Sequence, residues 1–245
     1  MKRQIFIATS VSAALAGCSP IGTALNNSNG VRNVLSVAER LDYALASGGM
    51  AREYPESAVA PVFRINGFAT PNDARYEALL ASHFRTYRLV VDGAVERPLS
   101  LSLGDLERYR QTTQITRHDC VEGWSVIGKW SGVRLGAVID AARPTPAARY
   151  AVFHCMDRDD SGVPYYESLD LVQAHHPQTL LALRLDDAAL DPDHGAPVRL
   201  RVATQLGYKS AKWVNRISLV GGFSRIAGGH GGYWEDQGYE WYAGI

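Results

Sequence analysis

The chain has 245 residues, of which 46% are hydrophobic and 20% charged, with 25 basic and 25 acidic residues and a formal net charge of +0. This is an ordinary globular composition, sufficient for one large domain with a small appendage. The balanced charge argues against a polyanionic partner, so we expect no nucleic acid among the partners.

The N-terminus, MKRQIFIATSVSAALAGCSP, has the pattern of an export signal. Lys2 and Arg3 precede an apolar run that is too short to span a bilayer. Leu15 to Cys18 resembles a bacterial lipoprotein processing box, so we expect residues 1–17 to be a signal peptide and Cys18 the acylated first residue. The predicted location is the periplasm, or the membrane surface through Cys18. A plain signal peptide with an incidental Cys18 is the alternative, and Lys2 in place of the first arginine of a twin-arginine signal leaves the export route open.

The next segment predicts a tether followed by a helix. Residues 19–30 are rich in Asn, Ser and Gly, which is typical of a flexible linker. Apolar residues at helical spacing then predict an amphipathic helix that ends at Gly48 and Gly49, namely Val31, Val34, Leu35, Ala38, Leu41 and Leu45. We therefore assign residues 18–60 to a tether and N-terminal helix, and residues 61–245 to the main domain.

Short strands and helices alternate irregularly in the main domain. Alternating polar and apolar residues predict strands over Tyr87–Gly93 and Val198–Gly207, and helical patterns cover Gly132–Ala142 and Ser168–His176. This irregular order indicates an α+β fold. The glycine-rich run from Gly221 to Trp234 lacks a Gly-Lys-Ser/Thr ending, so it predicts a turned loop, and the aromatic tail is expected to pack against a neighbouring surface.

The cysteines leave several interpretations open on the residues alone. If Cys18 is acylated, Cys120 and Cys155 are the two thiols that remain, and an oxidising compartment would favour a disulfide between them. A zinc site is less favoured, because no paired cysteines or histidines stand at zinc-ligand spacing near Cys120. A third interpretation is a cysteine-dependent peroxidase or hydrolase, in which the base would be one of three histidines, His118, His154 or His194.

Two ordered stretches carry a resemblance to a known family. CVEGWSVIGKWSGVRLGAVI, from Cys120 to Ile139, resembles the signature of the sulfite oxidase-like molybdopterin-dependent oxidoreductases, and Ser161–Val220 resembles their second signature region. The similarity extends over Val62–Val220 and is nearest to the bacterial type of protein-methionine-sulfoxide reductase catalytic subunit. The resemblance implies an α+β, sulfite oxidase-type molybdopterin-binding domain with mixed sheets and surrounding helices.

The same resemblance implies a molybdenum–molybdopterin cofactor, with Cys120 as the single protein ligand of the metal and the principal catalytic residue. One soft thiolate suffices there, because the pterin supplies two further sulfurs. Arg199 and Lys212 are the candidates to neutralise the pterin phosphate. The implied cofactor-binding residues are Asn66, Cys120, Cys155, His194, Arg199, Ser210, Ala211 and Lys212.

Each assignment has an alternative in the residues themselves. Arg199 and Arg201 alternate on a predicted strand, so one of them can face solvent. Lys209 and Lys212 can belong to a solvated turn, and Cys155 can be a buried core thiol.

The chain departs from sulfite-oxidising relatives in three respects. It has no Cys-x-x-Cys-His, so we expect no haem, and 25 residues after Val220 are too few for the family's C-terminal dimerisation domain, so we expect a monomer. The triplet Arg117-His118-Asp119 also differs from an arginine-rich sulfite pocket, and Arg117 and His118 are further candidate catalytic residues.

These features predict oxygen-atom transfer coupled to two-electron redox, in a sulfoxide or N-oxide reductase more than in a sulfite oxidase. The expected substrate is a small-molecule or protein sulfoxide, and a membrane redox partner would supply electrons. A non-catalytic domain of the same fold that binds a pterin or a partner is the alternative.

Overall fold

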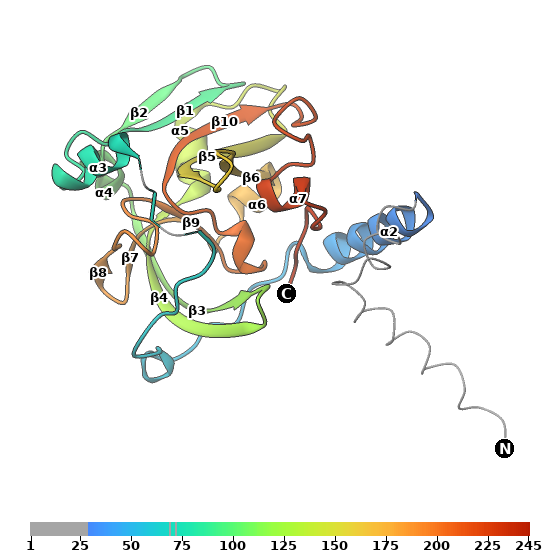
Figure 1. Cartoon of the computed structure of the whole chain (residues 1–245), viewed down its shortest axis with the longest axis horizontal. Coiled ribbons are helices and arrows are strands. Elements are labelled where there is room, and N and C mark those ends of the chain that lie inside the picture. Colours follow the sequence, from blue (N-terminus) through green and yellow to red (C-terminus); the bar gives the residue numbers. More distant parts are fainter. Residues whose placement is uncertain (1–28, 69, 72) are drawn as a thin grey trace. The chain divides into compact units, whose positions relative to one another are not determined.

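The computed structural model describes residues 29–68, 70–71 and 73–245 (Figure 1). The predicted signal peptide, Cys18 and most of the predicted tether lie outside these residues. The chain divides into two compact units, Met1–Leu45 and Ala46–Ile245. Helix α2 spans Asn29–Ala46 and confirms the predicted amphipathic helix. Within the described part of the chain, no helix is long and apolar enough to cross a membrane.

Residues 51–60 belong structurally to the larger unit. The backbone N–H of Tyr54 donates to Ile115 O at 2.9 Å, and that of Ala60 donates to Ile127 O at 3.0 Å. A short 3-10 helix, η1 (Glu56–Ala58), lies between these two contacts. This part of the stretch that the sequence assigned to the tether therefore pairs with the main domain.

One sheet of the described chain is mixed, with the strand order β2-β1-β10-β5-β6. Its strands are β2 (Leu99–Leu101), β1 (Leu89–Gly93), β10 (Val214–Val220), β5 (Tyr150–Arg158) and β6 (Pro164–Asp170). β1 and β10 are parallel, and the other neighbours are antiparallel. Gly93 has φ +87°, and a Cβ there would lie 2.2 Å from Leu219 O, so only glycine allows this close approach.

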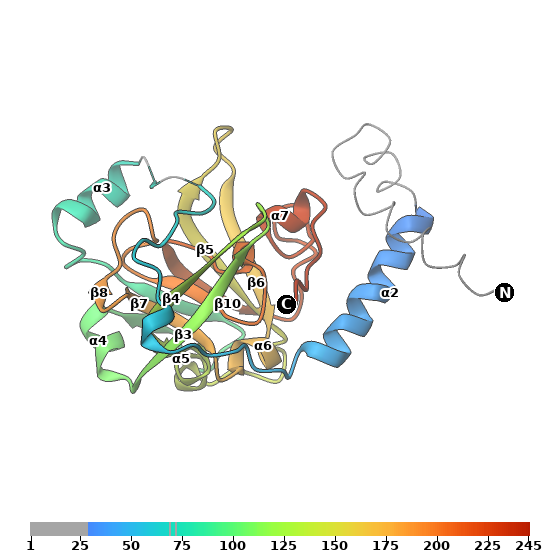
Figure 2. The same cartoon turned by 90° about the horizontal axis from the view of Figure 1, so that it is seen from below.

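The second sheet is antiparallel and has the order β3-β4-β7-β8, with β9 pairing to β7. Its strands are β3 (Gln111–Cys120), β4 (Trp124–Arg134), β7 (Thr179–Leu185), β8 (Ala188–Ala189) and β9 (Arg199–Val202). The long β3–β4 hairpin stays in register from Gln111 opposite Val133 to Cys120 opposite Trp124. Figure 2 shows β3 and β4 side by side along this hairpin, and α7 (Tyr233–Asp236) lies in the C-terminal segment after β10.

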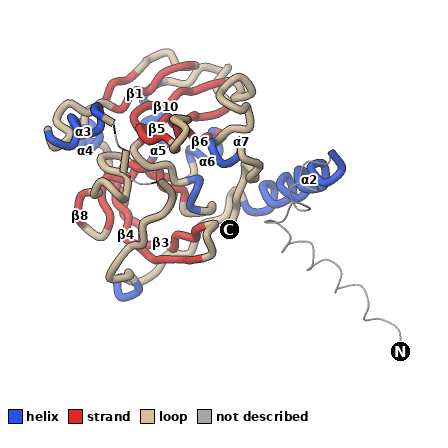
Figure 3. Tube along the Cα trace, viewed as in Figure 1, coloured by secondary structure: helices blue, strands red, loops and turns tan. Residues whose placement is uncertain are grey.

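The helices that follow α2 in the chain are short, as the colours of Figure 3 show, and those between β1 and β10 connect strands. They are α3 (Ala74–Ala81), α4 (Leu103–Arg108), α5 (Leu135–Ala142), α6 (Leu171–His175), the 3-10 helix η2 (Gly207–Lys209) and α7. The main core packs Leu135, Val138 and Ile139 of α5 with Phe153 and Trp213. The predicted α+β class is confirmed.

Two predicted helices begin later than expected. The helix predicted over Gly132–Ala142 starts at Leu135, because residues 132–134 pair with β7. The helix predicted over Ser168–His176 spans only Leu171–His175, because Ser168–Asp170 complete β6 and the Asp170 side chain caps the helix by accepting from Gln173 N. Tertiary strand pairing overrides the helical periodicity at both starts. The strand predicted over Val198–Gly207 is also shorter, since β9 ends at Val202.

Candidate active site

Cys120 is the last residue of β3 and lines a cavity that opens to solvent, with about 470 Å³ of space when the solvent-open part is included. Alternation along β3 buries Gln114, Thr116, His118 and Cys120 on one face. Gly207 lets η2 close onto this face, because a Cβ there would lie 2.4 Å from the His118 ring nitrogen Nε2. The cavity is lined by Asn66, Gly67, Phe68, Cys120, Val121, Glu122, Asp157, Tyr165, Gly207, Tyr208, Ser210, Ala211, Lys212 and Trp234.

The two cysteines of the main domain have different environments. Both Cys120 and Cys155 are free thiols, so the disulfide hypothesis is wrong. Cys155 lies in the hydrophobic core and is absent from the cavity lining, and burial raises the pKa of its thiol well above the usual value. Burial also raises the pKa of the Cys120 thiol, while Arg64 and Arg199 act in the opposite direction. Of the two, only Cys120 is placed to act on a ligand in this cavity.

Arg199 and Arg201 are both fully buried on β9, which contradicts the alternative that one of them faces solvent. Their guanidinium carbons lie 5.1 and 5.5 Å from the ring centre of Trp130. Arg199 donates to Asn66 Oδ1 at 2.9 Å and to His194 O at 3.2 Å, whereas its Nε has no partner among the described residues. Burial lowers the pKa of Arg199 to about 10. Neither arginine forms an ion pair in the part of the chain that the structure describes, which leaves their charge without a counterion.

Lys212 adds a third buried cation, and Lys209 is buried as well, so the alternative of a solvated turn is wrong. The Lys212 ammonium donates to Phe68 O at 2.6 Å and to Asp193 O at 3.1 Å. Burial, followed by repulsion from Arg199, lowers the pKa of Lys212 to about 7. Buried cations normally need a fixed counter-charge, so this cluster favours an anionic ligand.

Asp157 is a cavity residue that the sequence did not single out. It is 4% exposed, and its Oδ1 has no hydrogen-bond partner among the described residues. Burial raises the pKa of this carboxyl to about 7. The register of β5 against β6 shifts between His154 and Arg158, and Cys155, Met156 and Asp157 are all buried in succession. Residues 151–153 are buried in succession as well, so β5 is buried on both faces and shows no polar–apolar alternation from which Asp157 could be recognised.

Several predicted site residues lie away from the cavity lining. Both ring nitrogens of His194 are hydrogen-bonded, Nδ1 to Asp191 at 2.8 Å and Nε2 to Phe63 O at 3.0 Å. Arg199 therefore contacts His194 only at its backbone carbonyl. Arg117 is exposed on the opposite face of β3 and pairs with Asp119 at 2.8 Å. His118 is buried beside Arg201, and burial lowers the pKa of its ring well below the usual value.

The histidine and zinc hypotheses find no support in these contacts. His154 contacts Ser218 at 3.1 Å, and no described histidine ring hydrogen-bonds the Cys120 thiol. Within the described ranges, no group of three or more His, Cys, Asp or Glu side chains is arranged to hold a metal ion. The cavity instead combines one thiol, the side-chain amide of Asn66 and the buried cation Lys212, and Arg199 contacts Asn66 from outside the lining.

Residues 77–224 match the family model described as "Oxidoreductase molybdopterin binding domain". The putative protein-methionine-sulfoxide reductase subunit YedZ1 of Azospira oryzae is 35% identical over 248 residues, which covers 99% of this chain and 87% of that protein. The protein-methionine-sulfoxide reductase catalytic subunit MsrP of Campylobacter jejuni is 34% identical over 169 residues, or 64% of this chain. The matched region spans 57% of that relative's length.

The crystal structure of the sulfane dehydrogenase SoxCD from Paracoccus pantotrophus resembles the fold, with a TM-score of 0.50 and 24% identity. The likeness covers 56% of this chain and 39% of that chain. Cys120, Asp157, Arg199 and Lys212 all lie within the range that the family model matches, whereas Asn66 and Trp234 lie outside it.

Proposed function

Because the chain belongs to the family of oxidoreductases with a molybdopterin-binding domain, we propose that it is a reductase that removes the oxygen atom from sulfoxide-type substrates at a molybdenum centre held by Cys120. The observation that carries this proposal is the placement of the free Cys120 thiol in one cavity with the buried cation Lys212 and the amide of Asn66, which Arg199 contacts. The enzyme is thus a molybdopterin-dependent oxidoreductase, and we propose its Cys120 ligation, its substrate and its direction.

The cavity residues fit a molybdenum–pterin group. A soft thiolate is a suitable ligand for this metal, and the lone Cys120 provides it. Arg199, with its unpartnered Nε, and Lys212 would hold the pterin phosphate through charge-assisted hydrogen bonds. Asp157, whose Oδ1 is also unpartnered among the described residues, would accept from an N–H group of the pterin ring. Binding would thereby compensate charges that are buried at a cost in the protein alone.

When bound, the cofactor supplies two-electron redox chemistry coupled to oxygen-atom transfer. The protein's part is to position the cofactor and the substrate and to exclude water from the site. Metal binding requires the Cys120 thiol to lose its proton, and the nearby charges of Arg64 and Arg199 favour the thiolate. The amide of Asn66 is held by Arg199, which orients it before any ligand arrives.

The rim of the cavity favours an uncharged sulfoxide over an anion such as sulfite. Phe68 and Trp234 are half-buried there, and Val121 and Glu122 are exposed. Arg117, the arginine nearest to Cys120 in sequence, points to the opposite face of β3. Of the cations near Cys120, Lys212 and Arg199 are suited to the cofactor, and Arg64 lies 4.9 Å from the ring centre of Trp124. Glu122 at the rim would repel an anionic substrate.

We extend the proposal to the cellular setting. Both relatives are named as protein-methionine-sulfoxide reductase subunits, which supports a sulfoxide substrate and a partner subunit, and in our proposal this partner supplies electrons at the membrane. Export through the N-terminal signal, with a lipid anchor at Cys18, would keep the enzyme next to such a partner.

The test uses full-length protein made in a host that synthesises the molybdenum cofactor. Metal analysis and pterin fluorescence should give close to one molybdenum and one pterin per chain, and dye-linked assays should show reduction of methionine sulfoxide faster than oxidation of sulfite. A molybdenum content far below one per chain would overturn the cofactor site. Full cofactor content without reduction of any sulfoxide or N-oxide would favour the non-catalytic alternative.

A further inference from the structure

The C-terminal segment, residues 221–245, contributes directly to the cavity although the family model ends at residue 224. Its helix α7 places Trp234 in the cavity lining beside Phe68, with ring centres 6.1 Å apart. Trp234 also stacks on Tyr239, with ring centres 5.2 Å apart and planes inclined by 27°. An aromatic wall therefore forms from two ends of the main domain that are far apart in sequence.

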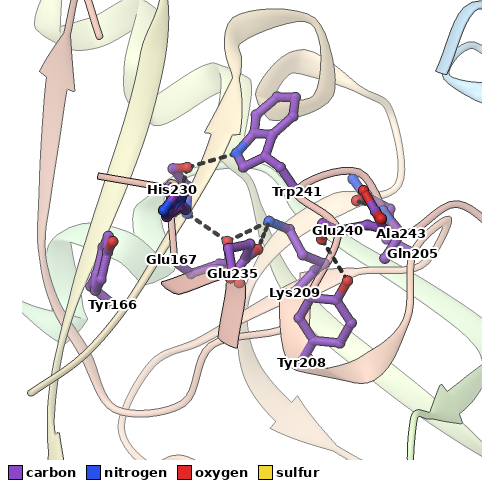
Figure 4. Close-up of polar contacts among 12 residues, drawn as sticks. Tyr166, Glu167, Gln205, Tyr208, Lys209, His230, Glu235, Glu240, Trp241 and Ala243 are labelled. Atoms are coloured by element: carbon purple, nitrogen blue, oxygen red, sulfur yellow. Dashed lines mark hydrogen bonds and ion pairs between the residues drawn. The ribbon is translucent and has the colours of Figure 1, made fainter. Parts of the chain in front are cut away.

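A buried ion-pair cluster holds this wall in place (Figure 4). Glu235, adjacent to Trp234, lies 2.5 Å from the Lys209 ammonium, which also pairs with Glu167 on β6. These three side chains are 0–1% exposed. Lys209 stands between Tyr208 and Ser210, both of which line the cavity. The cluster thus joins α7 to the loop that carries the proposed cofactor residues.

Further hydrogen bonds leave the segment little freedom. The Tyr233 hydroxyl donates to Asp159 Oδ2 at 2.8 Å, and the Tyr166 hydroxyl donates to Asp236 Oδ2 at 2.6 Å. Asp236 also accepts from the backbone of Gly228 and His230. A Cβ at Gly232 would lie 2.0 Å from the Glu235 carboxylate, so the chain is tightly packed around the ion pair. α7 is therefore a fixed part of the cavity wall.

The lining residues of the cavity differ in burial, and this difference distinguishes a cofactor side from a substrate side. Asp157, Ser210 and Lys212 are buried at the floor, where the unpaired charges favour the charged cofactor. Trp234 and Phe68 are half-buried at the rim. Phe68 and Trp234 are thus aromatic lining residues that a molecule entering from solvent can contact.

We propose that Trp234 is a specificity-determining residue, which selects uncharged sulfoxides that carry an apolar group, and that Glu235 and Lys209 are its positioning residues. An aromatic face favours contact with polarisable sulfur and with alkyl or aryl groups, and it disfavours hydrated anions. This inference rests on the proposed sulfoxide reductase function and names the part of the substrate that the site would recognise.

The experiment compares wild-type holoenzyme with Trp234→Ala and Trp234→Phe. The two substrates are dimethyl sulfoxide, whose apolar groups are small, and methyl phenyl sulfoxide, which carries one large apolar group. In Trp234→Ala we expect KM for methyl phenyl sulfoxide to rise about tenfold relative to that for dimethyl sulfoxide, with kcat changed less than about twofold. Trp234→Phe should restore most of the preference. Tyr54→Ala, which removes an aromatic ring outside the cavity, should leave both KM values unchanged.

Molybdenum content and the thiolate-to-metal absorption band should be the same in all four proteins. An unchanged ratio of KM values in Trp234→Ala would overturn the inference while leaving the reductase function intact. Loss of molybdenum in that variant would place the ring against the cofactor and would also overturn it. If the wild type reduces neither sulfoxide, the proposed function itself fails, and this inference fails with it.

The positioning role has a readout that is independent of turnover. In Glu235→Gln, we expect faster hydrogen–deuterium exchange in residues 225–245 and a shift in the KM ratio in the same direction as in Trp234→Ala, of about threefold. Glu107→Gln removes an exposed carboxylate that pairs with Arg184 at 3.4 Å and should change neither quantity. Faster exchange without a shift in the KM ratio would refute the positioning role, and so would an unchanged exchange rate.

Discussion

Arg199 donates a hydrogen bond from Nη2 to the side-chain oxygen of Asn66 across 2.9 Å, although 133 residues separate them in the chain. The bond joins β9 to a segment that precedes the first strand of either sheet. It uses one guanidinium nitrogen for the amide and leaves Nε unpartnered among the described residues. Arg199 is therefore both a structural link and a buried cation with an unpartnered donor, which suits a phosphate.

Replacement of Arg199 by Gln should release the cofactor without unfolding the protein. The pterin phosphate loses a buried charge partner, so we expect pterin and molybdenum per chain to fall to about a tenth of the wild-type content or less. The cofactor-free variant should melt at the temperature of the cofactor-free wild type or above it, because an uncompensated buried cation is removed. Arg216→Gln, at an exposed ion pair with Asp92, is the control. Full cofactor content in Arg199→Gln would contradict the assignment.

Replacement of Cys120 by Ser should abolish turnover and the thiolate-to-metal absorption band, because the hydroxyl is a poor substitute for a soft thiolate. The fold should remain nearly intact, since Cys120 ends a strand beside a turn. Cys155→Ser is the matched control, because Cys155 lies in the core and outside the cavity lining, and its cofactor spectrum should be that of the wild type. Absorption spectroscopy and dye-linked assays decide between the two thiols, and normal activity in Cys120→Ser would refute the ligand role.

Replacement of Lys209 by Met should destabilise the protein strongly, because it leaves two buried carboxylates facing each other without a cation. Breaking a buried pair in this way costs about 3–5 kcal/mol in the free energy of unfolding. Lys129 offers a matched control, since it also pairs with two carboxylates, Glu56 and Asp187, but these are about two-thirds exposed. In urea denaturation, Lys129→Met should lower the free energy of unfolding clearly less than Lys209→Met does. Equal losses in the two variants would argue against the buried cluster.

The stability of the cofactor-free protein should depend on pH through Asp157. Burial raises the pKa of its carboxyl from 3.8 to about 7, so the folded state holds a proton that the unfolded state has released. The stabilising contribution is complete below about pH 4 and is lost as the pH rises through about 7. A pKa difference of this size corresponds to on the order of 4 kcal/mol.

Denaturation at pH 5 and pH 8 tests this dependence. Asp157→Asn cannot ionise, so its stability relative to the wild type should increase between the two pH values. Asp160→Asn, at an exposed position on the turn after β5, should follow the wild type. Parallel pH profiles for wild type and Asp157→Asn would show that the carboxyl ionises normally in the folded protein.

The sequence alone determined the elements whose evidence is local or chemical. The helical spacing of apolar residues was enough to predict α2, and the mixture of strand and helix patterns was enough to predict the α+β class. Cys120 and the two ordered signatures were enough for the family, and the resemblance implied Arg199 and Lys212 as phosphate-binding residues, which stays a prediction. Such features depend on the spacing and the chemistry of residues in one stretch, which the sequence displays directly.

Only the tertiary structure decided which of these residues share a cavity. The irregular register of β5 places Asp157 in the lining and Cys155 in the core, and the alternation of β3 turns Arg117 away from Cys120. Trp234 and the Glu235–Lys209–Glu167 cluster join segments that no local pattern connects. Strand register, bulges and long-range packing are set by the free energy of the whole fold, so these contacts become visible only when the fold is complete.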